Sequence, residues 1–254
     1  MKPVLQAAAR GWARLPVPLG PAVMVLGYHR VDDVDDPLAV RPSTFAAQMA
    51  FLASRRDETP VFDLHDALHR LSSPTPPRRA VVLTFDDAWA DNHTHALPSL
   101  AEHGLPATLY APSQLLGRPG HLTPTQLLEL DAAGIAIGAH SRTHPDLRAC
   151  RGAELEAEVR GCRDDLEGLL GKPVTSFAYP CGLEDGRVRA AVAAAGYTSA
   201  VTTRRGWARG SVDRHRIPRN IVEEYGPATF AATVRGGSNV LRLADVFTTT
   251  VRRP

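Results

Sequence analysis

The stretch Ala80-Val81-Val82-Leu83-Thr84-Phe85-Asp86-Asp87 limits most strongly what this chain can fold into. Its first part is a continuous apolar run rich in β-branched residues, which predicts a strand buried on both faces. Such strands are typical of parallel α/β sheets, in which active sites lie at the C-terminal ends of the strands. Asp86 and Asp87 stand at that end and can hold different partners, because neighbouring strand residues point to opposite faces. A helix cap is the simpler alternative for these two carboxylates.

Strands and helices alternate along the rest of the chain, which predicts a largely parallel sheet and an α/β fold. Further strands are expected at 23–28, 107–111, 135–139, 175–179 and 199–202. Helices are expected at 43–55 with Ser43 as cap, 64–71, 92–103, 123–133 with Thr123 as cap, 153–170 and 185–195. Residues 1–20 form a poorly specified lead-in, and we predict that 21–254 form a single catalytic domain.

Charge and cysteine content exclude several classes of protein. The 254 residues carry a formal net charge of +2 with no dense basic block, so a nucleic-acid partner is not expected. The three cysteines, Cys150, Cys162 and Cys181, contain no CxxC pair, and an odd, sparse count argues against a disulfide framework.

No apolar run reaches the roughly 18 residues of a membrane span, so stable membrane insertion is not expected. A loose peripheral contact through Leu5, Trp12 and Leu15 is left open. The first apolar run, 23–26, is shorter than a signal-peptide core of about 7–15 residues. We therefore expect a cytoplasmic protein.

Two imidazoles, His140 and His144, directly follow the predicted strand 135–139. Imidazole is the commonest metal-binding side chain. Two histidines and one carboxylate, with a fourth position left for water, form a catalytic zinc pattern that also suits iron and other divalent ions. Solvated loop histidines are the alternative. The histidine pair follows one predicted strand, and Asp86-Asp87 follow another. Because both lie at strand ends, a metal site is favoured.

Three strings resemble the first three motifs of the polysaccharide deacetylase family, the NodB-homology group or carbohydrate esterase family 4. They are Thr84-Phe85-Asp86-Asp87, His140-Ser-Arg-Thr-His144-Pro145 and Phe177-Ala178-Tyr179-Pro180-Cys181-Gly182. The resemblance covers about residues 22–222. In addition, Tyr28-His29-Arg30-Val31 resembles the subgroup whose catalytic-acid histidine precedes the Asp-Asp motif, to which bacterial poly-N-acetylglucosamine deacetylases belong.

This resemblance implies an irregular (β/α) barrel with a metal at the strand ends. It implies that Asp87, His140 and His144 bind a divalent metal, with Zn²⁺ as the expected ion. It also implies that Asp86 is the general base. For the acid that protonates the leaving amine, His29 and His215 are the candidates. We predict His29, because it follows an apolar strand and so stands at a strand end, whereas His215 lies in a polar segment late in the chain. A packed or loop histidine without a catalytic part is the alternative for His29.

The chain departs from the family pattern at three positions. Ala178 stands where the third motif often has an Arg that orients the base, and Cys181 stands where it has Tyr. We take Arg219 as the candidate for the missing cation, with a surface arginine as the alternative. Cys181 can still offer its backbone N–H to an oxyanion. Ala88 replaces the family's usual Gly, and because Ala disfavours a positive φ, we predict a slightly different loop there.

Substrate contacts are predicted for Trp89, Trp207, Tyr179 and Cys181. The two tryptophans and Tyr28 are candidates for an aromatic wall beside a sugar ring, with core packing as the commoner role for Tyr28. Asp91, Asp165 and the acidic run 32–36 are interpreted as surface or loop charges.

Together these features predict metal-dependent hydrolysis of an acetamide on an N-acetylated sugar or glycoside. The expected partner is therefore an N-acetylated carbohydrate. One alternative is a zinc amidohydrolase acting on a non-sugar amide or imide, because a fold does not fix its substrate. Another is a carbohydrate-binding protein without catalysis, against which the complete set of metal and base residues argues.

Overall fold

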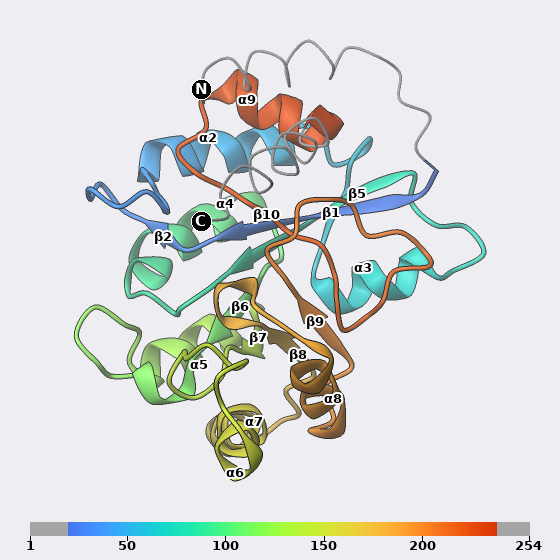
Figure 1. Cartoon of the computed structure of the whole chain (residues 1–254). Coiled ribbons are helices and arrows are strands. Elements are labelled where there is room, and N and C mark those ends of the chain that lie inside the picture. Colours follow the sequence, from blue (N-terminus) through green and yellow to red (C-terminus); the bar gives the residue numbers. More distant parts are fainter. Residues whose placement is uncertain (1–19, 238–254) are drawn as a thin grey trace, which may run out of the picture.

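The computed structural model describes residues 20–237, which form an α/β fold around one curled parallel sheet (Figure 1). The strand order is β10-β1-β5-β6-β7-β8-β9, with β4 paired to β5, and β2 and β3 form a separate small sheet. The strands are β1 (Ala22–Tyr28), β2 (Arg30–Val31), β3 (Ala39–Val40), β4 (Val61–Phe62), β5 (Arg79–Phe85), β6 (Thr108–Ala111), β7 (Ala136–Ala139), β8 (Ser176–Ala178), β9 (Ser199–Val201) and β10 (Asn220–Ile221).

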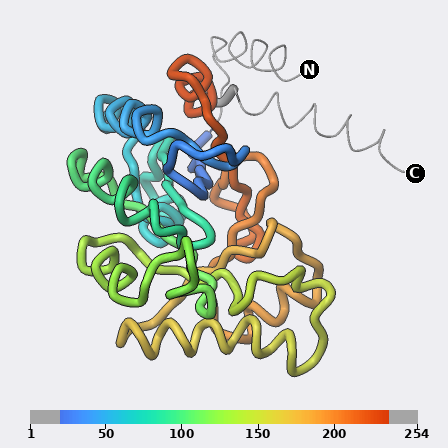
Figure 2. Tube along the Cα trace, turned by 90° about the vertical axis from the view of Figure 1, so that its left-hand side faces the viewer, coloured from blue at the N-terminus to red at the C-terminus, as the bar shows by residue number. Residues whose placement is uncertain are grey.

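Helices surround the strands, and Figure 2 shows them around the outside when the molecule is turned by 90°. The α-helices are α2 (Pro42–Ala53), α3 (Leu64–Leu71), α4 (Leu97–His103), α5 (Pro124–Ala132), α6 (Gly152–Glu156), α7 (Cys162–Leu170), α8 (Gly186–Ala194) and α9 (Pro227–Ala232). Short π-helical turns are η1 (Asn92–Ala96), η3 (Ala157–Gly161) and η5 (Thr233–Gly237), and 3₁₀ turns are η2 (Ser113–Leu115) and η4 (Pro180–Gly182).

The two longest strands, β1 and β5, form the centre of the fold. They pair residue by residue along their whole length, and this register places Tyr28 opposite Phe85. The residues that follow, His29 and Asp86, therefore leave the sheet side by side. At the other edge, β9 is connected to the segment before β10 by a bridge between Val201 and Ile217, which makes the closure of the barrel irregular.

The core has two parts because successive strand residues face opposite sides. Met24 and Leu26 belong to the larger cluster, which lies between the strands and the outer helices. Val23 and Val25 belong to the smaller cluster, which also contains the apolar face of α3. This helix packs against the concave side of the curled sheet. The predicted (β/α) barrel is therefore confirmed, and the C-terminal ends of its strands remain accessible to the candidate site.

Local signals placed most helix boundaries correctly. Thr123 caps α5 in a reciprocal pair with Gln126, and Gly104 ends α4 with φ 58°. The prediction for Ser43 is wrong, because Arg41 is the N-cap and Ser43 lies inside the first turn. Pro42 explains the shift, since its fixed φ suits the first helical position.

Within residues 20–237, none of the helices combines the length and the apolar character needed to cross a bilayer. Leu5, Trp12 and Leu15, considered above for a peripheral membrane contact, lie outside the described residues, as does most of the predicted lead-in.

Candidate active site

A buried ion pair, Asp86 with Arg219, lies at the C-terminal end of β5. The guanidinium donates two parallel hydrogen bonds, from Nη1 to Oδ1 and from Nη2 to Oδ2, each 2.6 Å long. Arg219 is fully buried, and it also donates to the Thr202 carbonyl and the Thr84 hydroxyl. The structure thus places the predicted cation against the predicted base, in the bidentate geometry that makes such pairs strong.

The charges around Asp86 decide its protonation state. Burial alone would raise the pKa of this carboxyl, but the neighbouring positive charge, above all that of Arg219, outweighs burial and lowers the pKa below its ordinary value. Asp86 is therefore a carboxylate at neutral pH, able to accept a proton. The pKa of Arg219 is raised, because the attraction of Asp86 exceeds the cost of burial.

Asp87, His140 and His144 come together one residue further along. One ligand atom from each lies within 4.8 Å of the others, and both histidine Nε2 atoms are 3.4 Å from Asp87 Oδ1. His140 Nδ1 lies 2.7 Å from the Ala178 carbonyl oxygen, so this nitrogen carries the proton. The lone pair of His140 Nε2 then faces Asp87, which is the arrangement of a metal-binding histidine oriented by a carbonyl. The donor set fits a divalent metal.

Backbone strain gathers around this cluster. Among the described residues, the non-glycine positions with positive φ are Asp87, Ala88, Ser141, His144 and Cys181. Such residues cost on the order of 1–3 kcal/mol each and persist only where the surroundings determine them. Ala88 adopts φ 54° despite its Cβ, so the positive φ is retained there against the expectation from the sequence.

His29 joins the cluster and His215 does not. His29 Nε2 lies 3.9 Å from Asp86 Oδ2, and its Nδ1 is buried without a hydrogen-bond partner among the described residues. Burial lowers the pKa of His29, although the negative charges of Asp86 and Asp87 oppose the shift. His215 Nε2 contacts the backbone carbonyl of Tyr197, which precedes β9 and so lies toward the opposite end of the sheet.

Trp89 and Cys181, two of the predicted substrate contacts, lie close to Asp87. The Trp89 indole donates to Asp87 Oδ2 over 3.3 Å, and its ring stacks on His121 at 4.5 Å between centroids. The Arg30 guanidinium lies 4.7 Å from the same ring centroid. Cys181 is exposed as a whole residue. Partial burial of its thiol and the negative charge of Asp87 raise the pKa of that thiol. Whether either residue contacts a substrate stays a prediction.

Two of the predicted substrate contacts lie elsewhere. Tyr179 is fully buried and its hydroxyl donates to the His215 carbonyl, so the ring is part of the core. Trp207 is 8% exposed, and Arg79, the first residue of β5, lies over its ring. The site residues follow the last residue of that strand, and seven strand residues span about 23 Å. Trp207 is therefore a packing residue at the far end of the sheet.

Sequence reasoning missed the part played by Asp91. This side chain is 5% exposed rather than a surface charge. It accepts hydrogen bonds from Arg30 Nε and from the Val31 N–H, each 2.9 Å long, and thereby holds the strand that follows His29. No local signal marks this role, since the contacts join segments about 60 residues apart. Asp165, by contrast, lies in α7, pairs with Arg142 and is partly exposed, as a surface charge would be.

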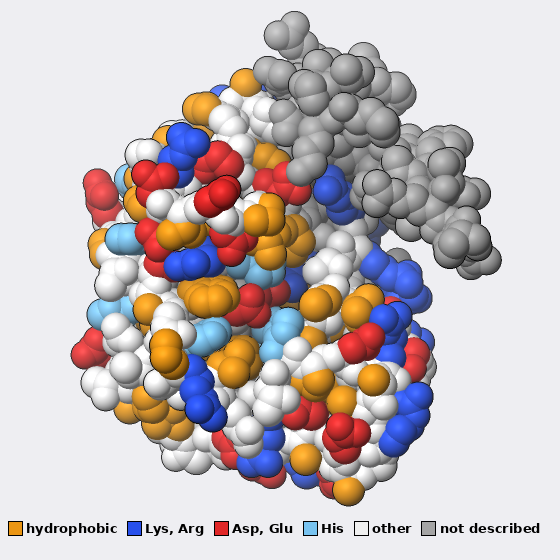
Figure 3. All heavy atoms as spheres, turned by 60° about the vertical axis from the view of Figure 1, so that its left-hand side comes forward, with side chains coloured by type: hydrophobic (Ala, Val, Ile, Leu, Met, Phe, Trp, Pro, Cys, Tyr) orange, Lys and Arg blue, Asp and Glu red, His pale blue; other side chains and the backbone are white. Residues whose placement is uncertain are grey.

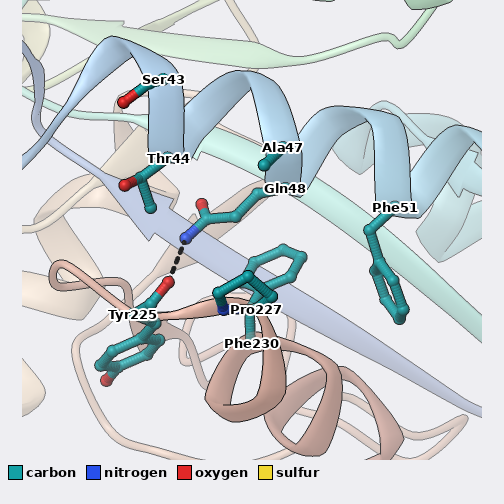
Figure 4. A pocket seen from close by; sticks show the side chains of 8 residues that line it. All are labelled: Ser43, Thr44, Ala47, Gln48, Phe51, Tyr225, Pro227 and Phe230. Carbon is teal, nitrogen blue, oxygen red and sulfur yellow. Dashed lines mark hydrogen bonds between the residues drawn. The ribbon is translucent and has the colours of Figure 1, made fainter.

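Figure 3 shows acidic and histidine side chains gathered in a hollow of the molecular surface. A separate groove of about 180 Å³ lies between α2 and α9 (Figure 4). Phe51 and Phe230 line it together with Gln48, whose amide donates to the Tyr225 carbonyl. None of the described residues that line this groove is an acid, a histidine or a cysteine, so the candidate catalytic groups are those at the strand ends.

Comparison with known proteins agrees with this geometry. The family model described as polysaccharide deacetylase matches residues 73–200. YxkH of Bacillus subtilis, whose name places it among polysaccharide deacetylases, is 27% identical over 196 residues, covering 76% of this chain and 70% of YxkH. A chitooligosaccharide deacetylase of Rhizobium leguminosarum bv. trifolii is 38% identical over 85 residues, covering 32% of this chain and 37% of that protein.

The solved structure of the Streptococcus pyogenes deacetylase PplD in complex with acetate is similar in fold. It superposes with a TM-score of 0.78 at 23% identity, covering 85% of this chain and 99% of PplD. The family match covers half of the chain and includes the Asp-Asp and His-x-x-x-His motifs that the fold brings together. The chain belongs to the polysaccharide deacetylase family, carbohydrate esterase family 4, whose reaction is hydrolysis of N-acetyl amide bonds.

Proposed function

We propose that this chain is a metal-dependent N-deacetylase that removes acetyl from an N-acetylated sugar or glycoside. The proposal rests on one observation: the candidate base and the candidate metal ligands lie next to each other at the C-terminal ends of the strands. Asp86, held by Arg219, lies beside the Asp87–His140–His144 cluster, and Asp86 Oδ2 is 3.9 Å from His140 Nε2. The chitooligosaccharide deacetylase named among the relatives supports an N-acetylated sugar as the substrate class.

The metal would be held by Asp87, His140 and His144. When bound, a divalent ion lowers the pKa of a water molecule and polarises an acetamide carbonyl. Asp86 is ionised and next to this position, so it can take the proton of the attacking water as general base. Arg219 holds both carboxylate oxygens and so fixes the direction in which Asp86 accepts that proton.

The leaving sugar amine needs a proton, and His29 is placed to supply it. It directly follows β1, and the register of β1 and β5 sets its position beside Asp86. A lowered pKa makes protonated His29 a stronger acid, and the nearby carboxylates oppose loss of its charge. The Cys181 backbone N–H is our candidate for a donor to the oxyanion of the tetrahedral intermediate, and Trp89 for a side wall of the sugar site.

Acetate release is the direct test of this function. Purified protein would be incubated with short N-acetylglucosamine oligomers and small N-acetylated glycosides, with added Zn²⁺ or with a chelator. Metal-dependent acetate release from a sugar is the expected result. Release only from non-sugar amides would favour the amidohydrolase alternative, and binding without release would favour an inactive carbohydrate-binding protein.

Metal content gives a second, independent measurement. We expect about one divalent ion per chain, removed by chelation, because three protein ligands with an open position form the catalytic zinc arrangement. His140→Ala should abolish most of the binding, since His140 is buried, oriented by the Ala178 carbonyl and central to the cluster. Metal analysis after dialysis would measure this, with His215→Ala as the matched control. Unchanged metal content in both His140→Ala and His144→Ala would remove the proposed ligand set.

The proton donor can be identified by comparing two histidine variants. His29→Ala should keep metal and fold but lower turnover far more than His215→Ala, because only His29 lies next to Asp86. The high-pH limb of the rate profile should disappear with His29, since that limb reports loss of the proton from the acid. Equal and mild effects of the two substitutions would instead favour solvent as the proton source.

A further inference from the structure

The loop between the two histidine ligands has no regular secondary structure to hold it. Ser141 and His144 both adopt φ 61°, a left-handed conformation that non-glycine residues rarely take. The hydroxyl of Ser141 accepts a hydrogen bond from the His144 N–H, 3.0 Å long. This contact is internal to the loop, so the position of the loop relative to the rest of the barrel must come from its neighbours.

Glu158, in the π-helical turn η3, provides the principal contact with the loop. Its Oε2 accepts hydrogen bonds from the backbone N–H groups of Arg142 and Thr143, each 2.9 Å long. Its Oε1 accepts from the Thr143 hydroxyl over 2.7 Å. A single carboxylate thus receives three hydrogen bonds from the residues that separate His140 and His144.

The same helical face makes a second connection to the loop. The Arg142 guanidinium donates to both oxygens of Asp165, over 2.8 and 2.6 Å. It also lies against Gly161, where a Cβ would stand 2.8 Å from Arg142 Nε. Glu158, Gly161 and Asp165 all lie against this loop, so they share one side of the helical segment. This side faces the histidine loop.

The opposite side of the loop is held by η2. Its first residues, Ser113 and Gln114, donate their backbone N–H groups to the Ser141 and Arg142 carbonyls, over 3.3 and 3.0 Å. The loop is therefore clamped with its carbonyls on η2 and its N–H groups on Glu158. Among residues 20–237, Glu158 is the one side chain that accepts hydrogen bonds from the backbone N–H groups between the two histidines.

We propose that Glu158 is a positioning residue that sets the metal affinity of the His140–His144 loop. This inference rests on the proposed metal-dependent function. Hydrogen bonds to a carboxylate are roughly twice as strong as neutral ones. They hold the loop in its strained conformation, in which both histidine Nε2 atoms face Asp87 Oδ1. With a weaker acceptor, the Arg142 and Thr143 N–H groups can turn to water, and His144 loses its fixed direction.

The test compares Glu158→Gln with Glu156→Gln, a matched change on the same helical segment. Glu156 has 68% of its side chain exposed and pairs only at 3.4 Å with Arg160, one helical turn away. Full-length protein would be titrated with Co²⁺ and with Zn²⁺ after removal of metal, following the cobalt absorption spectrum and the metal dissociation constant. Glu158→Gln should weaken binding about 10–100-fold, as changes around metal ligands commonly do, whereas Glu156→Gln should not.

Turnover at saturating metal shows whether Glu158 only positions the metal ligands or takes part in the reaction itself. Because Asp86, Arg219 and His29 are untouched, Glu158→Gln should regain most of its activity when enough metal is added. A dissociation constant equal to that of wild type would overturn the role of Glu158, even if the variant melts at a lower temperature. Wild-type protein that binds no metal would overturn the proposed function as well, so the two failures can be told apart. Thr143→Val, which removes only the hydroxyl donor, should give a smaller loss of affinity.

Discussion

Replacing Asp86 by asparagine should lower turnover on an N-acetylated sugar by about 10²–10⁴-fold, the usual effect of losing a general base. Metal should remain bound, because Asp87, His140 and His144 supply the proposed ligands and Asp86 is held by Arg219 instead. The amide of asparagine fills nearly the same space but cannot take a proton from water. Initial rates and bound metal would be measured on the same samples.

The matched control for this prediction is Asp87→Asn, one residue along the same turn. It should lose metal first and activity as a consequence, with partial recovery at high metal concentration. The reverse result, metal lost from Asp86→Asn and retained in Asp87→Asn, would exchange the two roles. Since Asp86→Asn leaves the Arg219 charge buried, the rates must be measured well below the melting temperature of the variant.

Arg219→Ala should destabilise the folded protein by about 3–5 kcal/mol, the cost of removing one partner of a buried ion pair. Asp86 is 2% exposed and would lose both short hydrogen bonds together with the compensating charge. The carboxyl would then tend to protonate, so activity should fall as well. Urea unfolding measures the stability, and Arg209→Ala, an exposed arginine ten residues earlier, is the control.

Arg219→Lys separates charge from geometry. A lysine keeps the positive charge but lacks the planar fork, so it cannot hold both oxygens of Asp86 at once. We expect a smaller loss of stability than in Arg219→Ala, with turnover still well below wild type. Full activity in Arg219→Ala would end the assignment of Arg219 as the residue that orients the base.

The pH dependence of stability provides a check on the same pair. The pKa of Asp86 is lowered in the folded protein, while an unfolded aspartate titrates near pH 4. The pair therefore contributes its full stabilisation above about pH 4, and this contribution is lost as the pH falls through the folded pKa. The difference in unfolding free energy between wild type and Arg219→Ala should shrink in acid. A difference independent of pH would show that the loss comes from packing alone.

Local patterns in the sequence predicted the residues that stand at strand ends. The apolar run before Asp86 and the strand before His140 each specify where a buried strand stops, because burial of a β-strand needs only its own side chains to be apolar. Parallel strands end at one edge of a sheet, and this rule predicts from the sequence that the carboxylates and the histidines lie close together. The short strands β2, β3, β4 and β10 were missed, since two residues carry no readable period.

Side chains that act through distant contacts could only be proposed. Arg219 and Asp86 are 133 positions apart, and their pairing depends on β10 lying beside β1. The position of His29 beside Asp86 depends on the register between β1 and β5. The aromatic residues illustrate the same limit. Tyr179 and Trp207 are of the residue types that line sugar-binding sites, but the structure buries both of them in the core.

The sequence by itself determined the fold class, the family and the identity of the residues that form the candidate metal cluster, because these depend on short patterns that each strand carries within itself. Arg219 and His29 were proposed from the sequence, but only the tertiary structure shows that both lie against Asp86, and only it shows that Glu158 contacts the histidine loop. Those contacts depend on strand register and on the direction of a helix face, and both are set by the packing of the whole chain.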